Sequence, residues 1–246
     1  MTSTQSSPAP TVPPGLRIYA IGDMHGRADL LRTLLATIEA DAARHPSVVK
    51  RMVFLGDYVD RGPQSKELID LVLDAAPPRM EVVTLMGNHE EMMQRFLSDT
   101  SVGRSWMVNG GDATLASYGV KPPSLFATDA RYRQAQMEFR DRIPDRHLRF
   151  LESLVTSYTA GDYLFVHAGV RPQIPLELQR PDDLLWIRDE FLRSEADFGK
   201  VVVHGHSIVR EPEMRRNRIA IDTGAYATGR LTCLVLEGTA KELLAT

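Results

Sequence analysis

The sequence predicts an α/β fold in which parallel strands are joined by crossover helices. Short apolar runs, each typical of a buried strand, alternate with segments whose apolar residues recur at helical spacing. The first five elements follow the order strand, helix, strand, helix, strand, which is the pattern of a parallel sheet. With 246 residues, 43% of them hydrophobic, the chain can bury a sizeable core without disulfides or structural metals.

The N-terminal half contains these five elements after a polar leader. Residues 1–15 are rich in Ser, Thr and Pro and lack an apolar run, which predicts a disordered leader. The elements predicted next, strands and helices in alternation, are 16–21, 30–38, 52–55, 68–73 and 82–86. Each of the three strands ends at a glycine.

The rest of the chain is predicted to complete the same domain. Residues 91–158 are mostly polar and carry helical patterns broken by Gly-Gly and Pro-Pro, which predicts a helical insertion. Apolar strands then return at 163–166, 200–203, 219–221 and 231–236. No linker rich in Pro, Gly and Ser separates the halves, so we expect a single domain over 16–246.

Composition excludes several classes of function. A net charge of −3 without a basic run argues against charge-driven nucleic-acid binding. No stretch reaches the ~18–20 apolar residues of a membrane span, and the start of the chain does not read as a secretory signal. The single cysteine, Cys233, cannot form an internal disulfide, which fits a reducing compartment. We therefore expect a cytoplasmic protein that binds neither membrane nor nucleic acid and shows no obligate partner.

Metal-type ligands follow the first three strands directly after their terminal glycines. Asp23 and His25 follow the first strand, Asp57 follows the second, and Asn88 and His89 follow the third. In open α/β sheets, binding sites gather outside the carboxyl ends of the strands. Three successive strands would therefore bring these side chains to one edge of the sheet, where clustered carboxylates would repel one another without a cation.

The later strands repeat the arrangement, with His167 after one strand and His204 and His206 around the end of another. Oxygen and imidazole donors without a thiolate suit Mn, Fe, Zn or Mg rather than a structural zinc site. The set is too large for one ion, and a shared Asp could bridge two ions ~3.5–4 Å apart, as in two-metal phosphoesterases. The sequence therefore predicts a two-metal centre.

With these motifs the chain resembles a known family, the calcineurin-like metallophosphoesterases, and in particular the bacterial members of their phosphoprotein phosphatase branch. The matching motifs are GDMHG at 22–26, GDYVDRG at 56–62, GNHE at 87–90, VHAG at 166–169 and HGHS at 204–207. The resemblance implies two packed β-sheets flanked by helices, an αββα sandwich. It also implies two divalent ions, with manganese favoured, held by Asp23, His25, Asp57, Asn88, His167 and His206.

The resemblance assigns further roles within the site. Asp57 would bridge both ions, and His206 rather than His204 would be the ligand, which leaves His204 a structural role or a place behind the metal ligands. Arg61 and Arg188 would hold the phosphate with help from Asn88. His89 would be the general acid, oriented by Asp60.

Three functions remain in competition on these residues. The first is dephosphorylation of phosphoserine and phosphothreonine proteins, with phosphotyrosine as a further candidate, by direct attack of a metal-bound water or hydroxide. The second is hydrolysis of dinucleoside polyphosphates at the same site, and the third is a non-catalytic scaffold. The segments 109–111 and 117–119 resemble small bacterial protein phosphatases, which favours the first and predicts a phosphorylated protein or peptide as substrate. Trp106 is expected to pack within the insertion, and whether Tyr226 reaches the rim of the site is left open.

Overall fold

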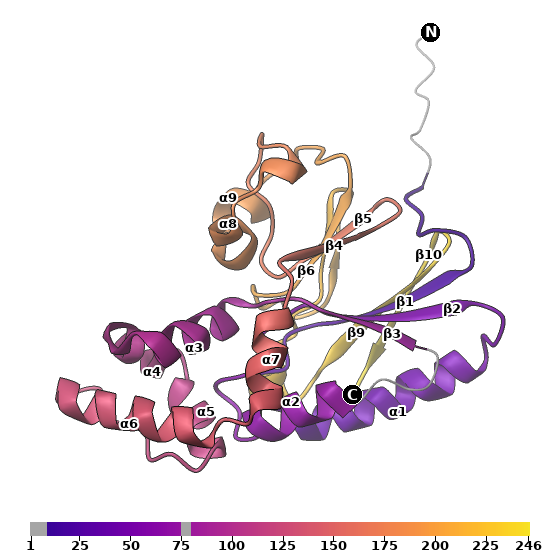
Figure 1. The fold of residues 1–246 in the computed structure, drawn as a ribbon. Helices are drawn as coiled ribbons and strands as arrows, with labels where there is room; N and C mark the ends of the chain where they lie inside the picture. The colour runs from indigo at the N-terminus through magenta and orange to yellow at the C-terminus, as the bar shows by residue number, and fades with distance from the viewer. Residues whose placement is uncertain (1–8, 75–79) are drawn as a thin grey trace, which may run out of the picture.

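The computed structural model describes residues 9–74 and 80–246, and it confirms the predicted αββα sandwich. Two five-stranded sheets pack face to face, and helices cover the outer face of each (Figure 1). Among the described residues, no helix has the length and apolar character needed to cross a membrane.

The first sheet has the strand order β10-β9-β1-β2-β3. Its strands are β1 (Leu16–Ile21), β2 (Val49–Phe54), β3 (Met80–Thr84), β9 (Thr232–Glu237) and β10 (Ala240–Ala245). The strands β1, β2 and β3 run parallel, whereas β9 and β10 are antiparallel to their neighbours. Every residue of β1 is buried because alternate side chains face different layers. Ile18 and Ala20 enter the core between the sheets, and Tyr19 and Ile21 face the helices.

Crossover helices connect the parallel strands on the outer face of this sheet. Helix α1 (Ala28–Ala43) links β1 to β2, and α2 (Ser65–Asp74) leads from β2 toward β3. Apolar residues at helical spacing, such as Leu31, Leu34 and Ile38 of α1, are buried against the sheet. This arrangement is the predicted one, and it places the carboxyl ends of β1, β2 and β3 at the same edge.

The second sheet has the order β4-β5-β6-β8-β7. Its strands are β4 (Ser157–Ala160), β5 (Tyr163–Val166), β6 (Val201–His204), β7 (Glu213–Met214) and β8 (Arg218–Ala220). The central strands β5, β6 and β8 are parallel, and the edge strands are antiparallel to them. The outer face is covered by η2 (Leu176–Leu178), α8 (Pro181–Trp186) and α9 (Asp189–Leu192). The short helix α10 (Ala225–Thr228) precedes β9.

The segment that connects β3 of the first sheet to β4 of the second is helical, as predicted. It consists of α3 (Asn88–Ser98), η1 (Thr100–Val102), α4 (Gly103–Val108), α5 (Gly111–Ser117), α6 (Asp129–Arg142) and α7 (Asp145–Ser153). Its buried aromatic residues, including Phe96, Trp106 and Phe139, belong to the same apolar cluster as the helix-facing side of the first sheet. The insertion is therefore packed onto the sandwich rather than separate from it.

Two expectations need correction. The leader was expected to be disordered over 1–15, yet residues 9–15 are packed on the fold, while 1–8 lie outside the described residues. Val12 is fully buried between the sheets, its N–H donates to the Gly238 carbonyl, and the Thr11 N–H donates to Asp162. The strands β4, β7 and β10 were not predicted, because these edge strands are mostly exposed and lack a clear apolar pattern.

Candidate metal centre

The loops that follow the parallel strands converge at one edge of the sandwich. Asp23 and His25 follow β1, Asp57 follows β2, and Asn88 and His89 begin α3 beyond β3. His167 and His206 arrive from the second sheet after β5 and β6. All seven side chains are buried. The structure therefore brings together every residue that the sequence predicted as a metal ligand.

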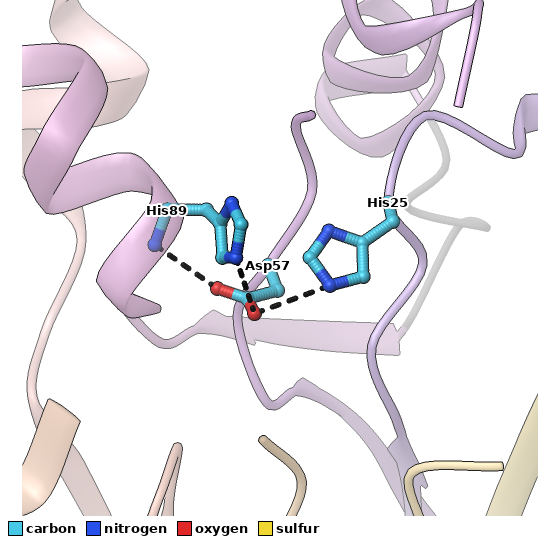
Figure 2. A group of neighbouring side chains, drawn as sticks. All are labelled: His25, Asp57 and His89. Carbon is cyan, nitrogen blue, oxygen red and sulfur yellow. Dashed lines mark hydrogen bonds and ion pairs between the residues drawn. The ribbon is translucent and has the colours of Figure 1, made fainter. Parts of the chain in front are cut away.

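Asp57 lies at the centre of two potential ligand groups, the first formed with His25 and His89 and the second with His167 and His206. Figure 2 shows its carboxylate between the imidazoles of His25 and His89. One carboxylate oxygen, Oδ2, lies 3.4 Å from His25 Nε2, and the other, Oδ1, lies 3.4 Å from His167 Nε2. Each oxygen thus faces a different group, which is the arrangement expected of a bridging carboxylate.

Backbone hydrogen bonds fix which nitrogen of each histidine faces the centre. The Nδ1–H of His25 donates to the Val59 carbonyl at 2.8 Å, and that of His167 donates to the Leu55 carbonyl at 2.9 Å. Each Nε2 atom therefore turns an unprotonated lone pair toward the centre, where a metal ion could accept it. Burial lowers the pKa of His25 to about 3 and that of His206 to about 2. The histidines are therefore neutral near pH 7, which is the form that binds metals.

Two buried atoms at the centre have no hydrogen-bond partner within the described structure, namely Asp23 Oδ1 and His206 Nε2. The other oxygen of Asp23 accepts the His206 backbone N–H at 2.9 Å, so these two residues are held together. Burial raises the pKa of Asp23, and the neighbouring carboxylates of Asp222 and Asp57 raise it further. A divalent cation would bind such unpaired oxygen and nitrogen atoms and would neutralise the crowded buried carboxylates. The residues present therefore fit a metal centre.

The predicted phosphate-binding groups lie on two sides of this centre. The Arg61 guanidinium contacts His25 Nε2 at 3.0 Å and His89 Nε2 at 3.2 Å. Arg188 donates instead to the His206 carbonyl and to Ser207 Oγ. The third predicted group, Asn88, has its Oδ1 2.9 Å from His167 Nε2. The two arginines therefore approach different ligand groups.

His89 and Asp60 form a buried pair beside the first group. His89 Nδ1 lies 2.7 Å from Asp60 Oδ2. Burial lowers the pKa of His89, but the charges of Asp57 and Asp60 outweigh it, so the net shift is upward. A histidine that stays protonated to higher pH and is oriented by a carboxylate is suited to donate a proton. His89 Nε2 also lies 3.9 Å from Asp57 Oδ2, which places His89 in the first ligand group as well.

The insertion supplies residues that hold Asp60, and the sequence did not reveal this role. Trp106 Nε1 donates to both carboxylate oxygens of Asp60, at 2.9 and 3.1 Å, and Thr114 Oγ1 donates to Oδ1 at 2.6 Å. Trp106 was expected only to pack. Its ring does pack on Gly111, where an added Cβ would approach it to 2.5 Å. No local sequence pattern marks a contact between residues so far apart along the chain.

We expect Trp106→Phe to lower kcat about 10-fold, because losing the indole donor loosens the Asp60 carboxylate that orients His89. The matched control is Tyr118→Phe, which also removes one buried hydrogen bond of the insertion, between Tyr118 Oη and His147 Nδ1. Both variants should lose thermal stability, but only Trp106→Phe should lose kcat. Equal kcat values for the two variants would exclude the positioning role.

Glu90 is a second residue whose function the sequence did not reveal. Its carboxylate accepts the backbone N–H groups of Asp57 at 2.8 Å, Tyr58 at 2.8 Å and Gly87 at 3.0 Å. Glu90 is the last residue of the GNHE motif at 87–90, but the resemblance assigned it no role. The structure shows that it ties the loop after β2 to the start of α3, and so it fixes the backbone of the central aspartate.

The backbone at the centre is strained. Within residues 9–74 and 80–246, six residues other than glycine have positive φ, and five of them belong to the candidate site: His25, Asp57, Asp60, Arg61 and His206. Such conformations cost of order 1–3 kcal/mol each and are held only where the surroundings impose them. Part of that support comes from Gly110, whose carbonyl accepts the Arg61 N–H and whose missing Cβ would lie 2.7 Å from that nitrogen.

His204 and Tyr226 take different positions relative to the centre. His204 is fully buried and stands edge-on to Phe191, with ring centroids 5.0 Å apart, on the side of the second sheet that faces α8 and α9. It belongs to neither ligand group. Tyr226 does reach the rim: its ring lies 5.4 Å from that of His25 and 4.8 Å from the Arg61 guanidinium carbon.

Comparison with known proteins identifies relatives along almost the whole chain. The family model described as calcineurin-like phosphoesterase matches residues 16–228. The protein PrpE of Anoxybacillus flavithermus, a bis(5'-nucleosyl)-tetraphosphatase of the asymmetrical type, is 29% identical over 234 residues. The match covers 87% of this chain and 88% of that protein.

Solved structures share the fold at lower identity. One, provisionally assigned as a diadenosine tetraphosphatase, has a TM-score of 0.60 at 20% identity, covering 97% of this chain and 98% of that one. A cold-active protein-tyrosine phosphatase from a psychrophilic Shewanella species has a TM-score of 0.58 at 19% identity, covering 95% and 83%. At these identities the likeness is one of fold.

Proposed function

The chain belongs to the calcineurin-like phosphoesterase family, a family of metal-dependent hydrolases, and from this premise we propose that it hydrolyses dinucleoside polyphosphates. The observation that carries the proposal is the near full-length similarity to PrpE of Anoxybacillus flavithermus. The resemblance of 109–111 and 117–119 favoured phosphoproteins, but these segments lie in the insertion. The similarity that spans 87% of the chain is a broader basis for the substrate class.

The proposed centre binds two divalent ions. Asp23 and His25 serve the first, Asn88, His167 and His206 serve the second, and Asp57 serves both. Ions bound there would polarise phosphoryl oxygens and lower the pKa of water toward ~7. The donors are carboxylate, amide and imidazole without thiolate, which suits manganese among other metals.

The remaining residues bind phosphate and move a proton. Arg61 and Arg188 lie beside different ligand groups, so each would pair with phosphate oxygens on its own side of the centre. His89, held by Asp60, is placed to donate a proton to a leaving oxygen that is basic enough to need one.

Dephosphorylation of phosphoserine and phosphothreonine proteins is the second candidate, and the buried His89–Asp60 pair favours it. A serine alkoxide leaves badly unless it is protonated, whereas a nucleotide phosphate is a far weaker base. A site that holds its acid at 2.7 Å from a buried carboxylate is equipped for the harder leaving group.

One preparation decides between the two candidates. With added manganese, kcat/KM is measured for diadenosine tetraphosphate and for phosphoserine and phosphotyrosine peptides. We expect the dinucleotide to be preferred at least about 10-fold and to yield ATP and AMP, the products of asymmetrical cleavage. The reverse preference would establish the phosphoprotein activity instead. Absence of both activities and of nitrophenyl phosphate hydrolysis would point to a scaffold.

Arg61→Ala and Arg188→Ala should each lower kcat/KM about 10²-fold while leaving bound metal nearly intact, because each guanidinium neutralises phosphate charge that the ions do not cover. Kinetics and metal analysis by mass spectrometry are made on the same samples. Arg104→Ala, which removes an exposed guanidinium paired with Asp129 on the insertion, is the matched control and should match the wild type. Loss of metal from the Arg61 or Arg188 variant would show that the arginine is structural.

A further inference from the structure

Three of the 17 aromatic side chains are exposed in the described part of the chain, and two of these three border the metal centre. Trp186 ends α8 and is 39% exposed, and Tyr226 lies in α10 and is 36% exposed. The third, Phe126, is 98% exposed in the insertion. Trp186 and Tyr226 are thus partly buried and partly open to solvent, so each leaves some aromatic surface available to a ligand beside the centre.

The two rings contact histidines of different ligand groups. Tyr226 stands edge-on to His25, with ring centroids 5.4 Å apart, and Trp186 stands edge-on to His206 at 6.4 Å. His25 belongs to the first group and His206 to the second, and the groups share Asp57 between them. The aromatic residues therefore flank the centre at its two ends.

Each ring also accompanies one of the two arginines. The Arg61 guanidinium lies over the Tyr226 ring, 4.8 Å from its centroid, and both Arg188 and Trp186 contact His206. The Trp186 indole is fixed by its Nε1–H, which donates to Glu91 at 2.6 Å. Each end of the centre thus offers a cation and, next to it, an aromatic surface that is partly open to solvent.

We propose that Trp186 and Tyr226 are specificity-determining residues that stack on the two nucleobases of a dinucleoside polyphosphate. The inference rests on the proposed function and deepens it. Such a substrate carries one base at each end of an anionic chain, and aromatic stacking binds any base because every base has a π-face. The polyphosphate lies across the metal centre and the arginines, and the bases reach the flanking rings. A phosphopeptide would leave at least one of these platforms unused.

The test compares ligands with and without bases. KM is measured for diadenosine tetraphosphate, and the inhibition constant of inorganic tripolyphosphate is measured against nitrophenyl phosphate. Trp186→Ala and Tyr226→Ala should each raise KM for the dinucleotide about 10-fold and change the tripolyphosphate constant less than about twofold. Tyr226→Phe and Trp186→Phe should restore most of the affinity because they keep a ring. Phe126→Ala is the matched control and should change neither constant.

The outcomes separate the inference from the proposed function. If the dinucleotide KM is unchanged in both alanine variants, or if it rises only in step with the tripolyphosphate constant, the stacking role is wrong although the function stands. A parallel rise would show instead that Tyr226 merely supports Arg61. If the wild-type protein hydrolyses nitrophenyl phosphate but not diadenosine tetraphosphate, the proposed function itself falls, and the stacking role falls with it.

Discussion

Asp57→Asn is expected to reduce hydrolysis by about 10³-fold or more, because the two oxygens of Asp57 face two different ligand groups. Removing its charge weakens both proposed metal sites at once. Metal ions typically supply several kcal/mol of transition-state stabilisation, and each 1.36 kcal/mol is about tenfold in rate. Turnover of nitrophenyl phosphate is measured at saturating manganese, and bound metal is counted on the same samples.

The control for this variant is Asp183→Asn, which also neutralises a buried aspartate, but one that lies in α8 and pairs with Arg171. It should keep both metal content and turnover. The wild-type protein treated with a chelator and freed of metal should be inactive and should recover when metal is returned. Chelated protein that hydrolyses phosphate esters at the untreated rate would refute the two-metal centre.

His89→Asn is expected to slow the hydrolysis of esters with poor leaving groups by ~10²–10⁴-fold, the usual contribution of general acid catalysis. A nitrophenolate leaves readily without a proton, as does a nucleotide phosphate, so the loss on these substrates should be much smaller. The comparison uses a phosphoserine peptide and nitrophenyl phosphate, with chemistry shown to limit the rate. Equal losses on both substrates would count against the acid role.

Asp60→Asn extends this test to the partner of His89. It should act in the same direction more weakly, because Asp60 orients and charges the imidazole without touching substrate. Asp60 is one of the groups that raise the pKa of His89, so its loss should move the alkaline limb of the rate profile to lower pH. Bound metal is also measured on His89→Asn. Metal content close to that of the wild type is expected of a general acid, whereas a large loss of bound metal would make His89 a ligand.

The candidate site was largely predictable because its residues follow directly after strands. A buried apolar run that ends in glycine can be recognised locally, and parallel strands bring the residues after their carboxyl ends to one edge of the sheet. The central position of Asp57, which belongs to both ligand groups, has the same origin, because β2 lies between β1 and β3 in the sheet. Local pattern and topology therefore predict the same cluster of ligands.

The supports of the site were not predictable in this way. Trp106 and Thr114 reach Asp60 from 46 and 54 residues further along the chain, and no periodic pattern connects them. Glu90 binds backbone N–H groups, which every residue other than proline possesses, so its partners leave no signature in the sequence. The order of residues 9–15 depends on Val12 filling a space between two sheets, a contact that exists only after the fold has formed.

At five positions of the centre, a side chain that the proposed chemistry requires comes with a strained backbone that lowers thermal stability. Glycine is the residue that a positive φ favours, because it has no Cβ to clash. Yet His25, Asp57, Asp60, Arg61 and His206 each carry a side chain that the proposed chemistry requires. At roughly 1 kcal/mol each, the combined strain is comparable to the smaller values in the usual range of total folding stability. The rest of the fold must therefore be more stable than an inactive protein of the same architecture would need to be, and selection for heat resistance alone would remove the site first.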